Sequence, residues 1–292
     1  MKKLLLLIIL LTSAPGDANA FTHMHKKHKI DIEGQEREYY EHNPFHKKNQ
    51  ITIIALAAKH KEKHILAQMQ FDNLAYKEDI LTIYPIPLND IWNDGTSNNP
   101  SSEVDDVLFI SNLIDDLVAR GVSDPNNIYI TGSSNGGNMA YRLACEITTK
   151  ISAIIPVAAG LPQNYKCSPK GKMALLALNI NNDKAIPQET NESSDFISKK
   201  ETMSLWTKNN DCKGVHLPKI LKTPKSKDKS TATVHKWLLC RAMLYDIDYF
   251  TKDPTELKKP ISERFVWPIT TNINTSLIIW TYIQRTHGVN KK

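Results

Sequence analysis

Short apolar runs and segments of helical periodicity alternate along most of the chain. Residues 51–58 (ITIIALAA), 151–158 and 173–178 are almost continuously apolar, a pattern typical of strands buried on both faces of a parallel sheet. Between the first two runs, apolar residues recur at helical spacing after Ser102 and stop at Gly121, which predicts a helix that ends at this glycine. The alternation predicts an α/β fold with a right-handed, doubly wound, mainly parallel sheet.

Further elements are expected around this core. Residues 29–32 and 37–41 flank Gly34 and predict a β-hairpin. Residues 190–235 are polar and rich in lysine, and only one helix is expected within them. The sequence contains no internal repeat, and no second domain is expected. The remaining expected elements are helices near 65–77, 198–208 and 275–285 and strands at 80–84 and 241–249.

The N-terminal residues have the pattern of a secretory signal peptide. Two lysines precede the apolar run Leu4–Leu11, and a small-x-small site ends at Ala20. The apolar run is too short to span a bilayer, and no later stretch is long and apolar enough to do so. We therefore expect residues 1–20 to be removed and residues 21–292 to form one secreted or periplasmic domain.

The chain has four cysteines, and in an exported protein this number favours two disulfides. Three pairings are open to four cysteines. We favour Cys145–Cys167 and Cys212–Cys240, because each pair closes a loop of moderate length. No two cysteines lie close together in the sequence, so nothing indicates a zinc site.

Basic residues exceed acidic residues, 37 against 31, and give a formal net charge of +6. The lysines fall in loops without interleaved aromatic residues, so solvated basic loops are favoured over nucleic-acid binding. His23, His25 and His28 stand in a basic leader that could hold a transition metal, but such leaders are more often inert. We expect no metal and no organic cofactor, and the oligomeric state is not predicted.

The most informative stretch joins a strand to a helix through a tight turn. Ile128–Thr131 is β-branched and aromatic, residues 132–136 read Gly-Ser-Ser-Asn-Gly, and helical periodicity follows. Strand, Gly-x-Ser-x-Gly and helix form the nucleophile elbow of α/β-hydrolases. The glycines admit a turn too crowded for side chains, and Ser134 would lie at the helix N-terminus, where free N–H groups favour negative charge. The alternative is a serine-rich loop before a helix.

Several short blocks, in the right order, resemble the secreted esterase family that includes polyhydroxybutyrate depolymerases and feruloyl or acetylxylan esterases. The resemblance runs over almost all of residues 21–292. It implies an α/β-hydrolase fold, a Ser–Asp–His triad and cleavage of carboxylic esters, in a polymer or a small molecule, through an acyl-enzyme. It also supports the two disulfide pairings favoured above. The blocks are Trp92–Gly95, Val104–Ile110, Asn127–Ala140, Asn182–Pro187, Trp206–Cys212, Trp267–Pro268 and Thr275–Trp280.

The resemblance assigns roles to particular positions. It implies that Ser134 is the nucleophile and Asp183 the triad acid, which follows the 173–178 strand as the chain order of such triads requires. The alternative for Asp183 is a turn residue, since Asn-Asn-Asp favours turns by itself. The expected oxyanion donors are the backbone N–H groups of Asn135 and of a residue near Ala58.

Two parts of the family pattern are missing. The family histidine precedes x-Trp-Pro, and in this chain Phe265 occupies that position. The His-Gly pair of the oxyanion loop is replaced by Ala57-Ala58, and the His-Gly before the acid loop by Asn179-Ile180. Loss of the triad histidine costs roughly a million-fold in turnover in a serine protease, and one missing oxyanion donor costs on the order of a hundred- to a thousand-fold. Ordinary triad catalysis is therefore not expected.

Three hypotheses remain open from the sequence. The first is an esterase that uses another base, and the second is an inactive hydrolase fold that binds a polyester, a polysaccharide or an acylated sugar. In the second, Trp92, Trp267 and Phe265 line the cleft, although each tryptophan could equally be core. The third is the product of a decaying gene. The candidate bases are His60, His64, His235 and His287, each of which is otherwise a solvated surface residue.

Overall fold

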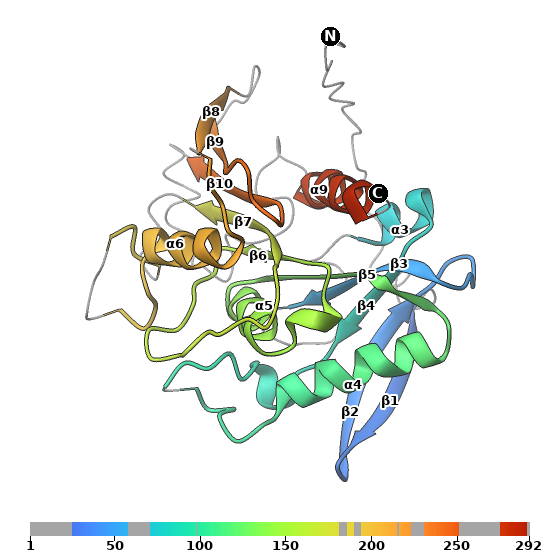
Figure 1. Cartoon of the computed structure of the whole chain (residues 1–292). Coiled ribbons are helices and arrows are strands. Elements are labelled where there is room, and N and C mark those ends of the chain that lie inside the picture. Colours follow the sequence, from blue (N-terminus) through green and yellow to red (C-terminus); the bar gives the residue numbers. More distant parts are fainter. Residues whose placement is uncertain are drawn as a thin grey trace.

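In the part of the chain that the structure describes, ten strands form one sheet in the order β1-β2-β4-β3-β5-β6-β7-β10-β9-β8 (Figure 1). The structure is a computed structural model, and it describes residues 25–57, 71–97, 99–180, 186–189, 194–214, 216–222, 231–250 and 275–290. The strands are β1 (Lys26–Ile32), β2 (Gln35–His42), β3 (Gln50–Leu56), β4 (Leu81–Pro85), β5 (Ser123–Ser133), β6 (Ala153–Val157), β7 (Ala174–Ile180), β8 (Leu217–Lys222), β9 (Thr231–Lys236) and β10 (Leu244–Phe250). The helices are α3 (Asp72–Glu78), α4 (Asp106–Ala119), α5 (Asn135–Glu146), α6 (Lys199–Asn209) and α9 (Thr275–Asn290), with short 3-10 turns η1 (Leu88–Asp90) and η2 (Thr148–Lys150).

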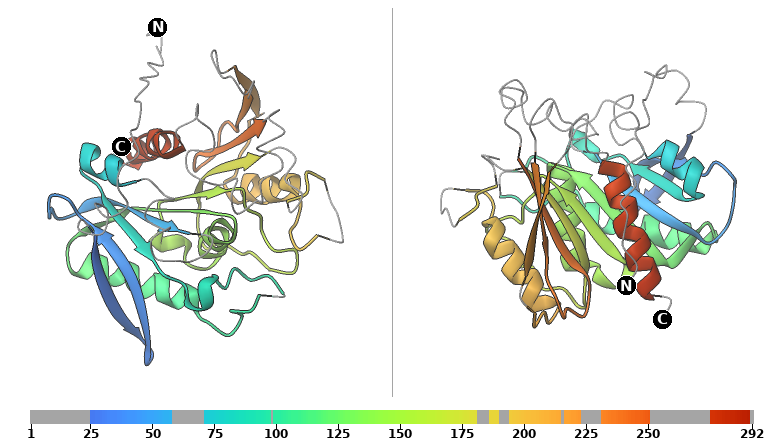
Figure 2. Two further views of the ribbon diagram at one scale, coloured as in Figure 1. Left: turned by 180° about the vertical axis from the view of Figure 1, so that it is seen from behind. Right: turned by 90° about the horizontal axis from the view of Figure 1, so that it is seen from above.

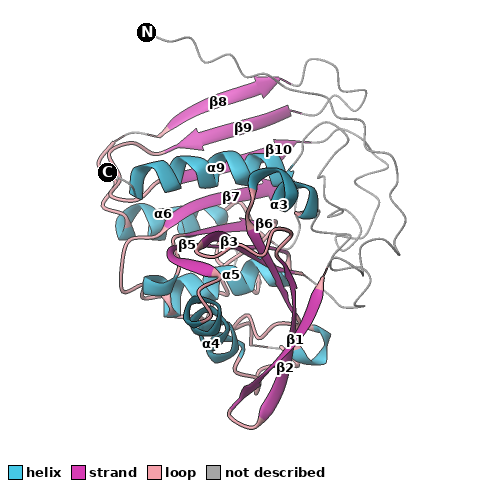
Figure 3. Ribbon diagram, turned by 90° about the vertical axis from the view of Figure 1, so that its right-hand side faces the viewer, coloured by secondary structure: helices cyan, strands magenta, loops and turns pink. Residues whose placement is uncertain are grey.

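The centre of the sheet is parallel and its two edges are antiparallel. Strands β4, β3, β5, β6, β7 and β10 pair in parallel in that order. The β1–β2 hairpin joins β4 at one edge, and β9 and β8 continue beyond β10 at the other (Figure 3). This arrangement confirms the predicted mainly parallel α/β sheet and the predicted hairpin.

Helices cover both faces of the sheet, because alternate side chains of the central strands point to opposite sides. Ile54, Leu56 and Ile130 pack with residues of α4, α5 and α6. Ile53 and Ala55 pack on the other face with residues of α3 and α9. Figure 2 shows α9 crossing its face of the sheet, with α6 on the opposite side. The fold is therefore doubly wound, as an α/β-hydrolase is.

The structure corrects several predicted boundaries. Helix α4 begins at Asp106 and not at Ser102, because the Asp105 carboxylate accepts a hydrogen bond from the Leu108 N–H at 2.8 Å and caps the helix. Helix α9 continues to Asn290, beyond the expected end at residue 285. Strands β8 and β9 were not predicted: β8 shows no apolar alternation, and β9 alternates only at Ala232 and Val234, within a polar, lysine-rich segment.

Both predicted disulfides are present. Cys145 in α5 is bonded to Cys167, with Cα atoms 5.1 Å apart, and Cys212 is bonded to Cys240, with Cα atoms 3.9 Å apart. Of the helices that the structure describes, none combines the length and the apolar character needed to cross a bilayer. The expected signal peptide, residues 1–20, lies outside the described residues.

Candidate active site at the β5–α5 turn

Ser134 stands between β5 and α5 in a strained backbone conformation. Its φ is 51° and its ψ is −123°, a combination that costs a residue with a side chain about 1–3 kcal/mol. The surrounding structure fixes this conformation, because the Ser134 N–H donates to the Val157 carbonyl at 3.0 Å and its carbonyl accepts from the Asn138 N–H at 2.9 Å. The hydroxyl therefore lies at the carboxyl edge of the parallel strands, where α/β sheets hold their ligands.

The glycines of the turn have no room for a side chain. A Cβ on Gly136 would lie 2.1 Å from the Leu56 carbonyl oxygen, and a Cβ on Gly132 would lie 2.4 Å from the Gly136 oxygen. A Cβ on Gly137 would lie 2.5 Å from the Cβ of Ala159. Strand β3, the turn and the first turn of α5 thus meet at backbone contact distance, which is the geometry of a nucleophile elbow.

The N-terminus of α5 offers a donor beside the serine. The Asn135 N–H makes no hydrogen bond to any residue in the described ranges, as expected for the first residue of a helix. Together with the helix dipole it favours negative charge next to Ser134.

The Asn135 side chain, in contrast, is fully engaged. It accepts from the Trp92 N–H at 2.8 Å and donates to the Trp92 carbonyl at 3.0 Å and to Asp94 at 2.8 Å.

Asp94 anchors the loop of residues 92–95 to the first turn of α5. Its buried carboxylate accepts hydrogen bonds from the side-chain amides of Asn99, Asn135 and Asn138 at 2.8–2.9 Å. Asn138 in turn accepts from the Gly160 N–H at 3.0 Å. This anchoring role was missed by sequence reasoning, which singled out the Trp-Asn-Asp-Gly block only for its resemblance.

Trp92 belongs to the core, which corrects its assignment as a wall of the substrate cleft. The side chain is completely buried, and its indole N–H donates to the Ala57 carbonyl at 2.9 Å. Its ring is nearly parallel to that of Phe109, with centroids 6.5 Å apart. The tryptophan holds the end of β3 in place and presents no surface to a ligand.

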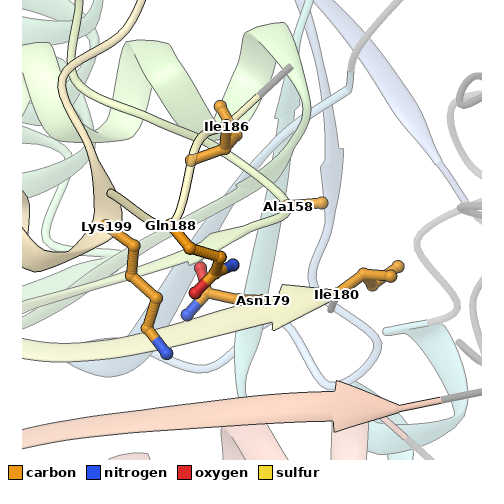
Figure 4. A pocket seen from close by; sticks show the side chains of 6 residues that line it. All are labelled: Ala158, Asn179, Ile180, Ile186, Gln188 and Lys199. Atoms are coloured by element: carbon orange, nitrogen blue, oxygen red, sulfur yellow. The ribbon is translucent and has the colours of Figure 1, made fainter. Parts of the chain in front are cut away.

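A shallow hollow lies at the carboxyl ends of β6 and β7 (Figure 4). Ala158, which has a φ of 44°, directly follows the residue that binds the Ser134 N–H. Residues 181–185, which carry the expected acid Asp183, begin where β7 ends at Ile180 and lie outside the described residues. The hollow is lined by Ala158, Asn179, Ile180, Ile186, Gln188 and Lys199.

The polar side chains of the hollow are tied to a buried network. The Lys199 ammonium contacts the Asp246 carboxylate at 2.7 Å and also binds Asp248, while the Asn179 amide donates to Asp246. Burial raises the pKa of Asp246 to about 7; the Lys199 ammonium opposes this shift and the Asp248 carboxylate adds to it. Lys199 is thus paired with two carboxylates and is not a free cation for a substrate.

His235 is part of the same network, which corrects the expectation of a solvated side chain. Its Nε2 lies 3.1 Å from Asp248 Oδ2, and its Nδ1 lies 2.8 Å from Nε2 of His216. Burial, with the positive charge of Lys199, lowers its pKa. Strand β9 is four strand spacings from β5, or about 19 Å, so His235 cannot take a proton from Ser134.

His287 is also too far away to act as the base, and it is not simply solvated. Its Nδ1 is hydrogen-bonded to the side chain of Asn127. Asn127 precedes Ser134 by seven residues along β5, which is about 23 Å of extended chain. Among the described residues, no histidine is hydrogen-bonded to Ser134 Oγ.

Six residues of the expected site lie outside the described residues. The structure therefore places Ser134 and Asn135 together at the turn, and leaves the acid, the base and the second oxyanion donor as expectations. These six are Ala58, His60, His64, Asp183, Phe265 and Trp267.

Comparison with known proteins points to esterases. No protein-family model matches the chain. Feruloyl esterase B of Piromyces equi is 27% identical over 139 residues, which are 44% of this chain and 25% of that protein, so the chain matches about a quarter of this relative's length.

Solved structures of esterases are similar as well. An acetyl xylan esterase from Aspergillus awamori matches 78% of this chain and 94% of its own, with a TM-score of 0.52 and 11% identity. A thermostable esterase matches 58% of this chain and 50% of its own, with a TM-score of 0.48 and 17% identity.

Proposed function

This chain has the α/β-hydrolase fold and is similar to esterases, and from that premise we propose that it acts on carboxylic esters through Ser134. The observation that carries the proposal is the strained conformation of Ser134 at the end of β5, among glycines that admit no side chain. A serine at an ordinary loop before a helix would need neither the strain nor the glycines. The substrate is an ester-bearing polymer or a small-molecule ester.

The proposed reaction forms and then hydrolyses an acyl-enzyme. Ser134 Oγ attacks the ester carbonyl carbon, and the Asn135 N–H, with a second donor near Ala58, binds the oxyanion that develops. The bond to the alcohol oxygen breaks, the alcohol leaves with a proton, and the acyl group remains on Ser134. Water then releases the acid and restores the hydroxyl. Asp183 is the proposed acid that orients the base.

The proposed turnover is slow, because the proton of Ser134 has no acceptor at the family position. Phe265 stands there, and a serine hydroxyl without a base is a poor nucleophile. His60 and His64 are the remaining candidates for a replacement base, since geometry rules out His235 and His287.

The second candidate is an inactive protein that binds a polyester, a polysaccharide or an acylated sugar. Phe265 favours it, because a phenyl ring at the family position of the histidine cannot accept a proton. Trp92 no longer supports it, since this side chain is buried.

We propose that the protein is exported. The pattern of residues 1–20 is that of a signal peptide, and the two disulfides favour an oxidising compartment. The mature domain then comprises residues 21–292.

The proposal is tested with p-nitrophenyl acetate and the mature chain. We expect weak hydrolysis that Ser134→Ala abolishes and that Ser133→Ala leaves within a few-fold of the parent. Ser133 is the matched control, because it is the neighbouring serine but ends β5. Equal hydrolysis by the parent and Ser134→Ala would refute a role for Ser134. A parent with no Ser134-dependent hydrolysis would favour the second candidate.

A further inference from the structure

Three potential metal ligands from separate elements converge on the α3 side of the sheet. His25 directly precedes β1, His42 ends β2, and Asp72 begins α3. One ligand atom from each side chain lies within 4.8 Å of the other two. All three residues are buried, with exposed fractions of 8%, 1% and 3%.

The contacts within this group leave one carboxylate oxygen without a donor. Asp72 Oδ1 lies 3.1 Å from His25 Nε2 and accepts a hydrogen bond from the Tyr84 hydroxyl at 2.9 Å. Asp72 Oδ2 is buried and accepts no hydrogen bond from a described residue. A buried carboxylate oxygen without a partner is costly and calls for an explanation.

We propose that His25, His42 and Asp72 form a binding site for a divalent transition-metal ion of the zinc class. Imidazole and carboxylate are ligands that suit zinc and its neighbours. Zinc binds histidine nitrogen at about 2.0–2.1 Å and carboxylate oxygen at about 2.0–2.2 Å, so tetrahedral ligand atoms lie about 3.3 Å apart. The three ligand atoms lie within 4.8 Å of one another, so side-chain rotations that bring them closer together would complete the site. Three protein ligands leave the fourth position to water.

Tyr84 helps to orient the Asp72 carboxylate. The Tyr84 hydroxyl donates a hydrogen bond to Asp72 Oδ1 at 2.9 Å, and both side chains are buried. Hydrogen bonds of this kind orient metal-binding carboxylates. Because Oδ1 already accepts from Tyr84, the unpartnered Oδ2 of Asp72 is the oxygen available to the ion.

A second group in the structure provides the contrast. His235, Asp246 and Asp248 also bring ligand atoms within 4.8 Å of one another. There the Lys199 ammonium contacts both carboxylates and already supplies the positive charge. In the described residues around His25, His42 and Asp72, no lysine or arginine forms an ion pair with Asp72. We therefore assign the metal site to the first group alone.

The ion would connect the β1–β2 hairpin to α3 and β4 and so stabilise this edge of the sheet. Strand β2 is three strand spacings from β5, or about 14 Å. The site is therefore separate from Ser134, and it does not depend on the proposed ester hydrolysis.

The test uses the mature chain without a histidine tag, stripped with a chelator and titrated with Zn²⁺ alone in a calorimeter. We expect one equivalent to bind with micromolar or tighter affinity, and saturating Zn²⁺ to raise the thermal unfolding midpoint by about 5–10 °C. Asp72→Asn and His42→Gln should each weaken binding by at least about a hundred-fold.

His23→Ala, in the histidine-bearing leader, and His235→Gln, in the second group, are the matched controls and should keep both the affinity and the shift. If binding is absent, or is lost in His23→Ala and retained in Asp72→Asn, the proposal is wrong. If the ligand variants do not fold, X-ray absorption of the zinc-loaded parent decides. Two imidazoles and one carboxylate at about 2.0–2.2 Å support the site, and any other ligand set refutes it.

Discussion

At the scale of single residues, the turn at Ser134 depends on neighbouring glycines that have no side chain. Gly136 and Gly132 lie against backbone atoms of β3 and of each other, so neither contact can be relieved by a side-chain rotation. Overpacking against flexible side chains costs about 1–3 kcal/mol. Against a rigid carbonyl, the strand or the turn itself must move.

We therefore expect Gly136→Ala to lower the free energy of unfolding by about 3 kcal/mol, because its Cβ would lie 2.1 Å from the Leu56 oxygen. Gly171→Ala is the matched control, since its Cβ would only touch Thr148 Cγ2 at 3.6 Å, and it should stay within about 0.5 kcal/mol of the parent. Urea unfolding of both variants provides the measurement. Equal stabilities would show that the turn has more room than the structure indicates.

The sequence was sufficient to predict the turn but not the place of Trp92. Each glycine of Gly-Ser-Ser-Asn-Gly is needed because a side chain at its position would collide with the backbone. A strand and a helix flank the motif, so few structures other than a tight strand-to-helix turn are compatible with it. A tryptophan suits both a core and a cleft wall. Only the position of the Ala57 carbonyl, which accepts the indole N–H, decides between the two.

At the scale of elements, β10 and α6 are joined by ion pairs between largely buried side chains. Asp246 and Asp248 on β10 share the ammonium of Lys199, the first residue of α6. The pKa of Asp246, about 7, is raised above the ordinary value of 3.8 chiefly by burial. Between about pH 4 and pH 7 the folded protein therefore binds more protons at this site than the unfolded chain does.

This difference makes stability fall as pH rises through the window from 4 to 7, after which the contribution is constant. We expect Asp246→Asn to remove that decline. The free energy of unfolding of the parent, minus that of the variant, should therefore fall by a few kcal/mol between pH 4 and pH 7. Denaturant unfolding at a series of pH values measures it. Glu189→Gln, at an exposed ion pair with Lys200, is the control and should give a flat difference. A flat curve for Asp246→Asn would contradict the raised pKa.

The elements that the sequence missed are those whose stability depends on partners far along the chain. Strand β8 carries no apolar alternation and β9 only a short one, and they form because β10 offers β9 an open edge. Helix α4 starts late because Asp105 caps it, and the buried Arg37, which comes from β2, pairs with Asp106 at its first turn at 2.6 Å. Pairings between residues 69 positions apart cannot be read from local spacing.

At the scale of the whole molecule, one sheet carries two proposed sites that lie apart from each other. The carboxyl edge at β5 and β6 positions Ser134, and the hairpin side carries the proposed metal ligands. The parallel order of the central strands could be predicted, because continuous apolar runs alternating with helices have few other arrangements. The surroundings of Ser134 could not be predicted fully, since the family pattern changes at Phe265 and at Ala57-Ala58.

The most direct test of a nucleophile without its base is to restore the base. We expect Phe265→His to raise hydrolysis of p-nitrophenyl acetate by about 10²–10⁴-fold, the usual contribution of a positioned general base. Ser134→Ala in the same chain should abolish the gain. If folded Phe265→His hydrolyses the ester no faster than the parent, or if its gain survives Ser134→Ala, then Ser134 is not a nucleophile that lacks only its histidine.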